Sequence, residues 1–262
     1  MEQFYSKLNS SYDVDMLYKR YENYRQEVSH IIKKQLKPRD SVLIVGPGNL
    51  NDLDLETFTD QPVHMLDIDL RSVEEGIRRQ NHLISDYRLI QGDITGLSKS
   101  GFYNNFNLLQ LDYDKIEFDF ELNQYDLIII LPIYTQILLP QLMMEVSYES
   151  LNAYLPLIQE RINNFNSLLY RHLNEEGRLV IFSDVLEYKT DQEEAKYLIA
   201  HKNHKIILDD FFNSYLNTFG HGLGSYGILD ASTKVRQNEL GYLVWPFSDD
   251  RTMLVQWLSG KK

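Results

Sequence analysis

The sequence predicts one α/β domain built on a doubly wound, mostly parallel sheet, with helices on both faces and an antiparallel hairpin at the C-terminus. Short apolar runs typical of strands buried on both faces recur along the chain, and they alternate with segments of helical three-four spacing. Two strand-like segments near the C-terminus flank a short polar turn, which indicates a hairpin. The length of 262 residues, 43% of them hydrophobic, suits one sizeable core better than two.

Composition and charge exclude several classes of function. The formal net charge of −12 disfavours binding of a polyanion, so we expect no nucleic-acid partner. The sequence contains no cysteine, which excludes disulfides, thiolate metal sites and cysteine nucleophiles, and we predict no bound metal. The N-terminus carries no apolar signal core, and no run approaches the length of a membrane span. We therefore expect a soluble, cytoplasmic protein without a membrane partner.

The first predicted helix covers residues 15–35, where apolar residues at three-four spacing form one stripe. Packing against the sheet is the simpler role for this helix. The alternative is that it closes over a ligand and places its tyrosines in the pocket.

A buried strand is expected over residues 42–45, and it ends abruptly at Gly46-Pro47-Gly48. Glycines without a Cβ let the backbone approach a ligand, although such a turn can equally serve a tight bend. We expect the next helix to begin near Asn51 or Asp52, with one of these side chains capping its free amides.

Acidic residues follow the second predicted strand directly. Residues 63–66 form this strand, with Asp67 and Asp69 at its end. In an open parallel sheet, ligands bind outside the carboxyl ends of the strands, where an acidic residue after the second strand can accept both ribose hydroxyls. Asp67 follows Gly46 by 21 residues, which is close to the offset expected for that role. Asp69 is expected to cap a helix over residues 70–81.

A third strand is predicted over residues 87–90, followed by Gly92 and Asp93. The Asp93 carboxylate can accept a hydrogen bond from an adenine amino group, with Ile94 as an apolar wall beside the base. The alternative is an ordinary Gly-Asp turn.

Residues 98–124 are long for a connection, and their second half alternates apolar and acidic side chains. We interpret the segment as an insertion with a half-buried strand over 116–122, in a hairpin with Leu109 and Leu111. A fourth buried strand over 127–131 then ends at Pro132, beside the expected ligand.

The second half of the chain is predicted to contain further helices, a fifth strand and the hairpin. A glycine-rich aromatic stretch over 208–227 is interpreted as a loop, which either covers a pocket as a mobile lid or lies on the surface without a ligand. Pro156 is expected in the first turns of its helix. The predicted helices cover 140–147, 151–173 and 192–201, the fifth strand covers 179–182, and the hairpin strands cover 241–247 and 252–258.

These elements divide the chain into two parts. Residues 1–37 are expected to form an N-terminal helical extension. Residues 38–262 are expected to form the main domain, with insertions at about 98–124 and 185–238.

Residues 38–258 resemble the class I S-adenosylmethionine-dependent methyltransferases, through the glycine turn, the aspartates after the second and third strands and the terminal hairpin. The resemblance implies a Rossmann-like sheet of seven strands whose last strand is antiparallel and inserted beside the fifth. It also implies S-adenosylmethionine as cofactor, with the two glycines under the methionine part, Asp67 at the ribose, and Asp93 and Ile94 at the adenine. The cofactor contacts implied in this way are Gly46, Pro47, Gly48, Asn49, Asp67, Ile68, Asp93, Ile94, Leu131 and Pro132.

The resemblance has departures in its motifs. Ile44 occupies a position where the family often has an acidic residue, and Leu50 occupies the place of a third glycine. The loop after the fourth strand reads LPIYTQ rather than Asn-Pro-Pro-Tyr or Asp-Pro-Pro-Tyr, which disfavours methylation of nucleic-acid bases. The implied activity is methyl transfer by in-line displacement to a small-molecule or protein acceptor.

Such an enzyme needs mainly to align a nucleophile with the activated methyl group and to exclude water. Where a general base is required, the catalytic candidates are Tyr134, Asp184 and His221. A packing or surface role is the simpler interpretation of each of these three residues.

Other functions are open on the residues alone. A nicotinamide-dependent oxidoreductase would use Gly46, Gly48 and Asp67 in the same way, although Asn51 replaces its third glycine or alanine. A non-catalytic protein that binds S-adenosylmethionine, or that serves as an interaction module, is the other alternative. An aminopropyltransferase such as spermidine synthase shares the fold, but the acidic residues of its motif are absent at 131–134. A homo-oligomer is compatible with the sequence.

Overall fold

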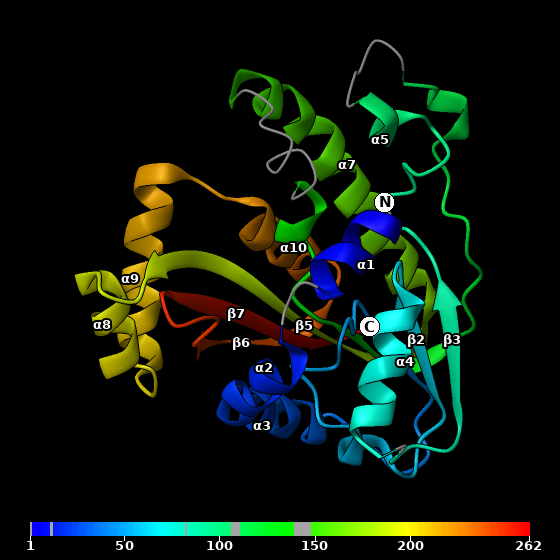
Figure 1. Ribbon diagram of the computed structural model, residues 1–262, viewed down its shortest axis with the longest axis horizontal. Coiled ribbons are helices and arrows are strands. Elements are labelled where there is room, and N and C mark those ends of the chain that lie inside the picture. The colour runs from blue at the N-terminus through cyan, green and yellow to red at the C-terminus, as the bar shows by residue number, and fades with distance from the viewer. Residues whose placement is uncertain (1, 11–12, 82, 106–110, 139–147) are drawn as a thin grey trace.

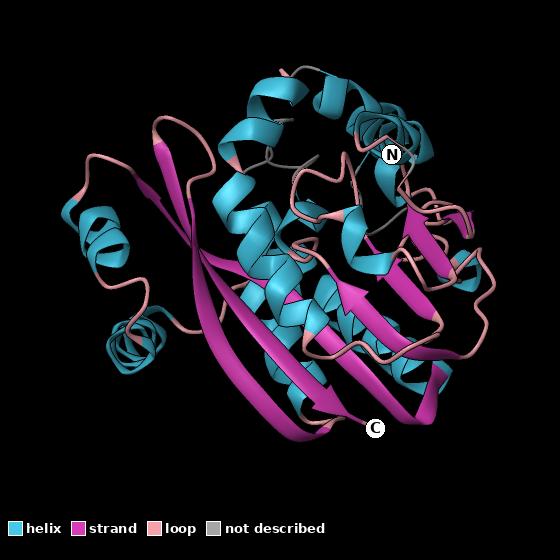
Figure 2. Ribbon diagram, turned by 90° about the horizontal axis from the view of Figure 1, so that it is seen from below, coloured by secondary structure: helices cyan, strands magenta, loops and turns pink. Residues whose placement is uncertain are grey.

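The computed structural model describes residues 2–10, 13–81, 83–105, 111–138 and 148–262. Its centre is a seven-stranded sheet in the order β3-β2-β1-β4-β5-β7-β6 (Figures 1 and 2). β7 runs antiparallel to both of its neighbours, β5 and β6, and the other strand pairs are parallel. The strands are β1 (Val42–Val45), β2 (Val63–Asp67), β3 (Tyr87–Gln91), β4 (Tyr125–Ile130), β5 (Leu173–Lys189), β6 (Arg236–Trp245) and β7 (Arg251–Lys261).

The predicted fold class is confirmed, including the terminal hairpin and the antiparallel strand inserted beside the fifth. All four residues of β1 are buried, as expected for a strand covered on both faces. Successive side chains of a strand point to opposite faces, so β1 divides its residues between two cores. Leu43 and Val45 join one core, while Val42 and Ile44 join the other.

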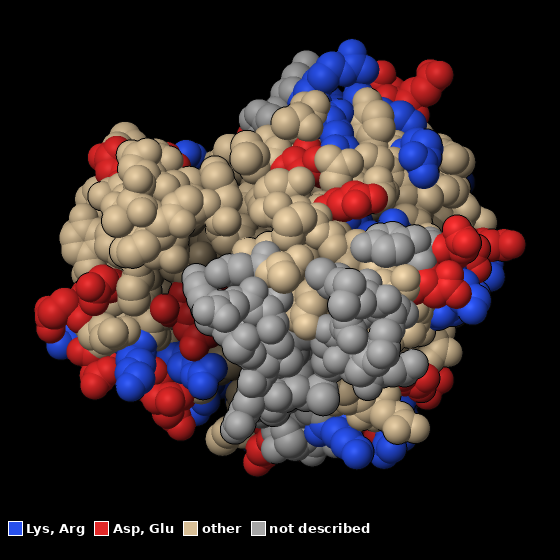
Figure 3. Space-filling view, turned by 90° about the horizontal axis from the view of Figure 1, so that it is seen from above, with Lys and Arg blue, Asp and Glu red and all other residues tan. Residues whose placement is uncertain are grey.

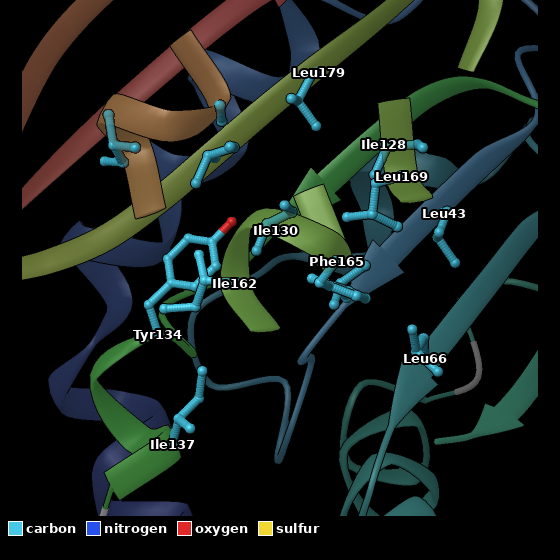
Figure 4. Close-up of a cluster of buried hydrophobic side chains, with 14 of the residues drawn as sticks. Leu43, Leu66, Ile128, Ile130, Tyr134, Ile137, Ile162, Phe165, Leu169 and Leu179 are labelled. Atoms are coloured by element: carbon cyan, nitrogen blue, oxygen red, sulfur yellow. The ribbon is translucent and has the colours of Figure 1, made fainter. Parts of the chain in front are cut away.

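The first core lies under α7 (Tyr148–His172) and α10 (Leu223–Ser232). In Figure 4, Ile162, Phe165 and Leu169 of α7 lie beside the side chains of the central strands. The second core lies under α3 (Glu22–Lys33) and α4 (Leu70–Arg79), which cover the opposite face. Helices on both faces leave the carboxyl ends of the strands as the place for a site.

The strands β5, β6 and β7 extend well beyond the core and carry α8 (Glu193–Ala200) and α9 (Lys205–Phe219) at one side of the molecule (Figure 1). A small separate core attaches these two helices, with Leu198 and Phe212 packed on Leu186 and Leu254. The remaining helical elements are α1 (Glu2–Ser10), α2 (Val14–Arg20), η1 (Leu55–Phe58), α5 (Phe102–Asn105), η3 (Tyr113–Lys115) and η4 (Thr135–Leu138).

The predicted helix over 15–35 is divided in two. α2 ends at Arg20 and α3 begins at Glu22, with Tyr21 between them as the cap residue of both. Tyr21 is 3% exposed, and its hydroxyl donates to the carbonyl of Phe247, so its contacts with the sheet fix the break. The apolar stripe of α3 packs in the second core as expected, whereas α1 was not predicted.

The helix predicted near Asn51 or Asp52 does not form. A loop runs from Gly46 to Asp54 and leads into the 3-10 helix η1. Asn51 caps nothing, because its carbonyl accepts from Arg25 and its side chain accepts from Arg79. Side chains from neighbouring helices thus satisfy this backbone in place of a helical turn.

The strand predicted over 116–122 is also wrong, because these residues pair with no strand. Their alternation is correct, since even-numbered residues are partly buried and odd-numbered residues are exposed. Phe118 and Phe120 pack against Phe165 of α7 at ring-centroid distances of 5.9 and 6.5 Å. Packing of alternate side chains on a helix therefore produced the pattern without a hydrogen-bonded ladder. Leu109 lies outside the described residues, and so does the predicted helix over 140–147.

The stretch 208–227 lies mostly in α9 and α10 rather than in a loop, with only residues 220–222 as a short connection between the two helices. Its last glycines lie inside α10, where a Cβ on Gly224 would be 2.1 Å from the Asp184 carbonyl oxygen. A Cβ on Gly227 would be 2.5 Å from the Tyr134 ring. These glycines therefore allow α10 to pack closely on β5 and on Tyr134, rather than providing the freedom of a lid. Pro156 likewise lies in the interior of α7 and not in its first turns, because α7 already begins at Tyr148.

None of the helices in the described part of the chain combines the length and the apolar character that crossing a bilayer requires.

Candidate functional site

A cavity of about 540 Å³ opens at the carboxyl ends of the strands. This volume is in the range of small-molecule and cofactor sites. One end is lined by the glycine turn after β1 and by the segments that follow β2 and β3, and the other end by residues of β5, β6 and β7 together with Asp52 of the loop after β1. The cavity lining therefore extends across the sheet, from the end of β3 to β6 and β7.

The glycine turn after β1 forms part of this lining. Gly46 has φ +69° and Gly48 has φ +49°, a conformation that side chains rarely adopt. A Cβ on Gly46 would lie 2.1 Å from Cγ2 of Ile133, whereas a Cβ on Gly48 would meet nothing within 4 Å. Gly46 thus serves close packing, and Gly48 leaves its backbone open to the cavity. Leu50, which replaces the third glycine, keeps a left-handed φ of +54° while its side chain is buried in the second core.

Helix α4 holds the loop after the turn. Nη1 of Arg79 donates to the Asn49 carbonyl at 3.1 Å, and Nε2 of Gln80 donates to the carbonyls of Leu50 and Leu53 at 3.0 and 2.8 Å. Gly76 lets the helix approach, because a Cβ there would lie 2.6 Å from the Asn49 oxygen. The turn is therefore fixed from outside before any ligand binds.

Asp67 lies at the end of β2 and connects the turn with α4. Its Oδ2 accepts the amide of Gly48 at 2.9 Å, and its Oδ1 accepts the amide of Asp69 at 2.8 Å. Burial raises the pKa of Asp67 to about 6, although these amide hydrogen bonds lower it. Each carboxylate oxygen retains a second acceptor position. The predicted cap is confirmed, since Asp69 accepts the amide of Ser72 at the start of α4.

Asp93 also lines the cavity, but its carboxylate is occupied by its own loop. It accepts the amides of Thr95, Leu97 and Ser98 at 2.9 to 3.1 Å. The hydroxyl of Ser98 donates to the same carboxylate at 2.8 Å. These donors use the acceptor capacity of a carboxylate, so in this conformation Asp93 organises the loop after β3.

Helix α1 lies over the strand ends (Figure 1). Tyr5 of this helix lines the cavity, and its hydroxyl donates to the Gln136 carbonyl at 2.7 Å. Burial raises the pKa of Tyr5, and the nearby charges of Asp93 and Asp67 raise it further. Tyr5 therefore connects η4 with the ends of β2 and β3.

The other end of the cavity combines acids with aromatic rings. Oδ2 of Asp184 accepts the hydroxyl of Thr135 at 2.6 Å, and burial raises the pKa of Asp184. Burial also raises the pKa of Asp52 to about 7, with Arg25 opposing and Asp184 adding to the shift. Tyr21, Trp245 and Phe247 form the aromatic part of the lining.

The structure brings nine of the ten implied cofactor residues to the cavity lining, and their contacts with a cofactor stay a prediction. The tenth, Leu131, is buried in the second core. Of the catalytic candidates, only Asp184 lines the cavity. Tyr134 is fully buried and donates to Oδ1 of Asn166 at 2.6 Å, and Figure 4 shows its ring among core side chains. His221 is exposed between α9 and α10, near Ser225.

Sequence reasoning missed several lining residues. Asp52 was interpreted as a helix cap, and Tyr5 lies in a helix that was not predicted. Trp245 and Phe247 were assigned only to a hairpin strand. No local pattern marks these residues, because the chain reaches the cavity from distant positions.

Comparison with solved structures finds methyltransferases at low identity. The chain has the strand order of a class I methyltransferase. No family profile matches the sequence, and no curated protein matches it. The N-methyltransferase NodS from Bradyrhizobium japonicum WM9 has a TM-score of 0.49 at 12% identity, over 92% of this chain and 98% of that chain. An O-methyltransferase family protein from Burkholderia thailandensis has a TM-score of 0.47 at 11% identity, over 95% of this chain and 59% of that chain. At TM-scores below 0.5, these likenesses carry no argument about function.

Proposed function

We propose that this protein binds S-adenosylmethionine in the cavity and transfers its methyl group to a small-molecule or protein acceptor. The observation that carries the proposal is the charge of the lining. Its charged residues are Asp52, Asp67, Asp93, Asp184, Glu187 and Arg251, five acids and one base. An acidic cavity attracts a sulfonium cation.

The same charge disfavours a cofactor that carries phosphates. Dinucleotide folds place the pyrophosphate at the N-terminus of a helix that follows the first strand. In the described residues, the loop after β1 leads only to the 3-10 helix at Leu55, so that site is missing. The usual strand order of dinucleotide-binding folds has no inserted antiparallel strand, whereas this sheet has β7 between β5 and β6. These two features favour S-adenosylmethionine, which carries no phosphate, over a nicotinamide dinucleotide.

The residues present fit the proposed cofactor. Gly48 leaves space beside its backbone, and Asp67 keeps acceptor positions for two ribose hydroxyls. Bound S-adenosylmethionine supplies an activated methyl group that leaves its sulfur on attack by a nucleophile. The chain's own part is to hold the cofactor at the turn, to align the acceptor and to exclude water, with Tyr5 and α1 above the strand ends.

Titration calorimetry with S-adenosylmethionine and S-adenosylhomocysteine tests the proposal. We expect micromolar binding of both and a loss of at least about tenfold in Asp67→Ala, since two charge-assisted hydrogen bonds disappear. The exposed Asp60 provides a matched control, because Asp60→Ala removes an acid outside the cavity. Absence of binding, or tighter binding of NADH, would refute the proposal. Cofactor binding without turnover on a broad acceptor panel would instead favour the non-catalytic alternative.

A further inference from the structure

The end of the cavity over β5, β6 and β7 contains buried polar atoms that belong to none of the implied cofactor residues. Oδ1 of Asp52 and Oδ1 of Asp184 are both buried and have no hydrogen-bond partner among the described residues. Neither carboxylate takes part in an ion pair within that part of the chain. Unpaired buried carboxylates are costly, and native structures rarely retain them without a functional reason.

Trp245 of the lining and Tyr24, which stacks on it, also have unpartnered polar atoms in the described residues. Trp245 lines the cavity and is 5% exposed, and its Nε1 has no partner in the described residues. Tyr24 is 1% exposed, and its hydroxyl likewise lacks a partner there. Burial raises the pKa of Tyr24, and the charges of Asp52 and Asp184 raise it further. Asp52, Asp184 and Trp245 thus line one cavity, and Tyr24 stacks on Trp245, with one polar atom of each of the four residues left without a partner in the described part of the chain. We refer to Tyr24, Asp52, Asp184 and Trp245 as the acidic subsite.

An aromatic wall borders the acidic subsite. The Trp245 ring lies 5.1 Å from Tyr21 and 5.1 Å from Phe247, measured between centroids, with edge-to-face geometry. Tyr24 stacks on Trp245 at 4.9 Å with an interplanar angle of 9°. Aromatic faces attract cations, particularly ammonium groups in desolvated sites. The wall and the carboxylates therefore favour the same kind of ligand.

The nearest basic side chains do not neutralise the acidic subsite. Nη1 of Arg25 donates to the carbonyls of Tyr18 and Asn51, and its charge reaches Asp52 without an ion pair. Arg251 lines the cavity but pairs with Glu187 at 3.2 Å. Two carboxylates therefore face this end of the cavity without a cation of their own.

We propose that this end of the cavity binds the methyl acceptor, and that the acceptor is a small molecule with a cationic amine, held between Asp52, Asp184 and the aromatic wall. The cationic group serves for recognition: it is a quaternary ammonium, whose molecule accepts the methyl group at another atom, or a protonated amine. The nitrogen of a protonated amine can attack the methyl carbon, as the carbon–sulfur bond breaks, only after its proton has passed to a carboxylate of the acidic subsite. The assignment as acceptor rests on the proposed function, whereas the recognition of an amine rests on the acidic subsite alone. The indole N–H of Trp245 can in addition donate to an oxygen of the same molecule.

Calorimetry at pH 8 with two amines and their neutral counterparts tests the inference. The pairs are choline with 3,3-dimethylbutanol and phenethylamine with 2-phenylethanol, each titrated with and without S-adenosylhomocysteine. We expect each amine to bind at least about tenfold more tightly than its neutral counterpart. Asp52→Asn and Asp184→Asn should each weaken amine binding about tenfold or more, and each should weaken binding of S-adenosylhomocysteine, which lacks the sulfonium charge, by a smaller factor. Asp60→Asn should change neither affinity.

The inference would be overturned if choline and phenethylamine bound no more tightly than their neutral counterparts. It would also be overturned if both asparagine variants bound these two cations as tightly as the wild type does. Tighter binding of a lysine-containing peptide than of either amine would overturn its small-molecule part. If an asparagine variant fails to give a thermal unfolding transition, Trp245→Phe replaces it, with an expected loss of amine affinity of several-fold. A protein that binds S-adenosylhomocysteine but not amines refutes only this inference. Amine binding without any binding of S-adenosylmethionine supports the amine subsite and refutes the proposed function.

Discussion

Asp52 shows how a single buried carboxylate connects the stability of the protein with its proposed chemistry. Its Oδ1 has no partner in the described residues, and burial raises its pKa from 3.8 to about 7. The folded state therefore holds a proton that the unfolded chain releases at lower pH. Stability should fall as the pH rises from about 4 to about 7, because the unfolded state binds fewer protons over this range.

We expect Asp52→Asn to remove this dependence in the ligand-free protein. The variant should become more stable than the wild type by on the order of 2 to 4 kcal/mol at pH 8, and the difference should vanish near pH 4. Urea unfolding at several pH values measures the effect, with the exposed Asp60→Asn as control. If the free energy of unfolding of the wild type and that of Asp52→Asn changed with pH in parallel, Asp52 would not titrate in this range.

Gly76 offers a second residue-scale prediction. An alanine in a helix usually stabilises, but here its Cβ would lie 2.6 Å from the Asn49 carbonyl oxygen. We expect Gly76→Ala to cost about 1 to 3 kcal/mol and to weaken S-adenosylmethionine binding, because the glycine turn must shift. Gly222→Ala is the control, since a Cβ there meets nothing within 4 Å. Unfolding curves and calorimetry together measure both effects, and a more stable Gly76→Ala protein would contradict this packing argument.

At the scale of elements, α1 is the helix whose role is most specific to the site. It reaches the cavity through Tyr5, and the contact with Gln136 ties it to the loop after β4. The core helices α3 and α7 instead bury apolar stripes against the sheet. The position of α1 is therefore stabilised by few contacts with the rest of the protein. We expect a bound ligand to stabilise it further.

We expect Tyr5→Phe to weaken S-adenosylmethionine binding about fivefold, which corresponds to the loss of one hydrogen bond of about 1 kcal/mol. The unfolding midpoint should change little, because α1 lies outside both large cores. Glu2→Ala, an exposed change in the same helix, is the matched control. Calorimetry measures the affinities, and equal affinity of both variants with the wild type would mean that α1 does not contribute to binding.

At the scale of the whole molecule, the sheet is fixed at the end opposite to the cavity by one buried ion pair. Nη2 of Arg178 contacts Asp40 at 2.7 Å, with side chains only 5% and 8% exposed. Arg178 also donates to the carbonyls of Gln35 and Asp126, so it joins the segment after α3 to β4 and β5. On the face of the molecule shown in Figure 3, acidic and basic side chains are interspersed around the rim. The described atoms on this face form no continuous basic patch.

We expect Arg178→Met to destabilise the protein by about 3 to 5 kcal/mol, because Asp40 is then buried without its partner. The double variant Asp40→Asn with Arg178→Met should recover part of this loss. Lys205→Met is the control, since its pair with Asp209 is largely exposed and should contribute less than about 1 kcal/mol. Urea unfolding measures all three, and a loss below about 1 kcal/mol in Arg178→Met would show that the pair is not needed.

The local signals in the sequence were reliable for the seven strands of the sheet and for the glycine turn. The β1 run is apolar at every position because both faces are covered, and Gly46 and Gly48 are needed for the positive φ and for close packing. Two patterns led to wrong predictions. The alternation over 116–122 predicted a strand, but it reflects packing of alternate side chains on α7. The glycines of 220–227 predicted a loop, but those inside α10 reflect its close packing on β5. Alternating apolar and polar residues occur both in a strand of a β-sheet and in an extended segment that packs on a helix. Only the element on which the segment packs distinguishes the two cases.

The sequence by itself therefore determined the doubly wound α/β sheet, its terminal hairpin and the acidic residues at the ends of β2 and β3. Hydrophobic period, glycine and charge act over a few residues, so they can be read locally. Only the tertiary structure decided that Asp52, Asp184 and Trp245 converge on one end of the cavity, that Asp93 is occupied by its own loop and that Tyr134 belongs to the core. Convergence of distant residues depends on strand order and on helix packing, which no local pattern encodes.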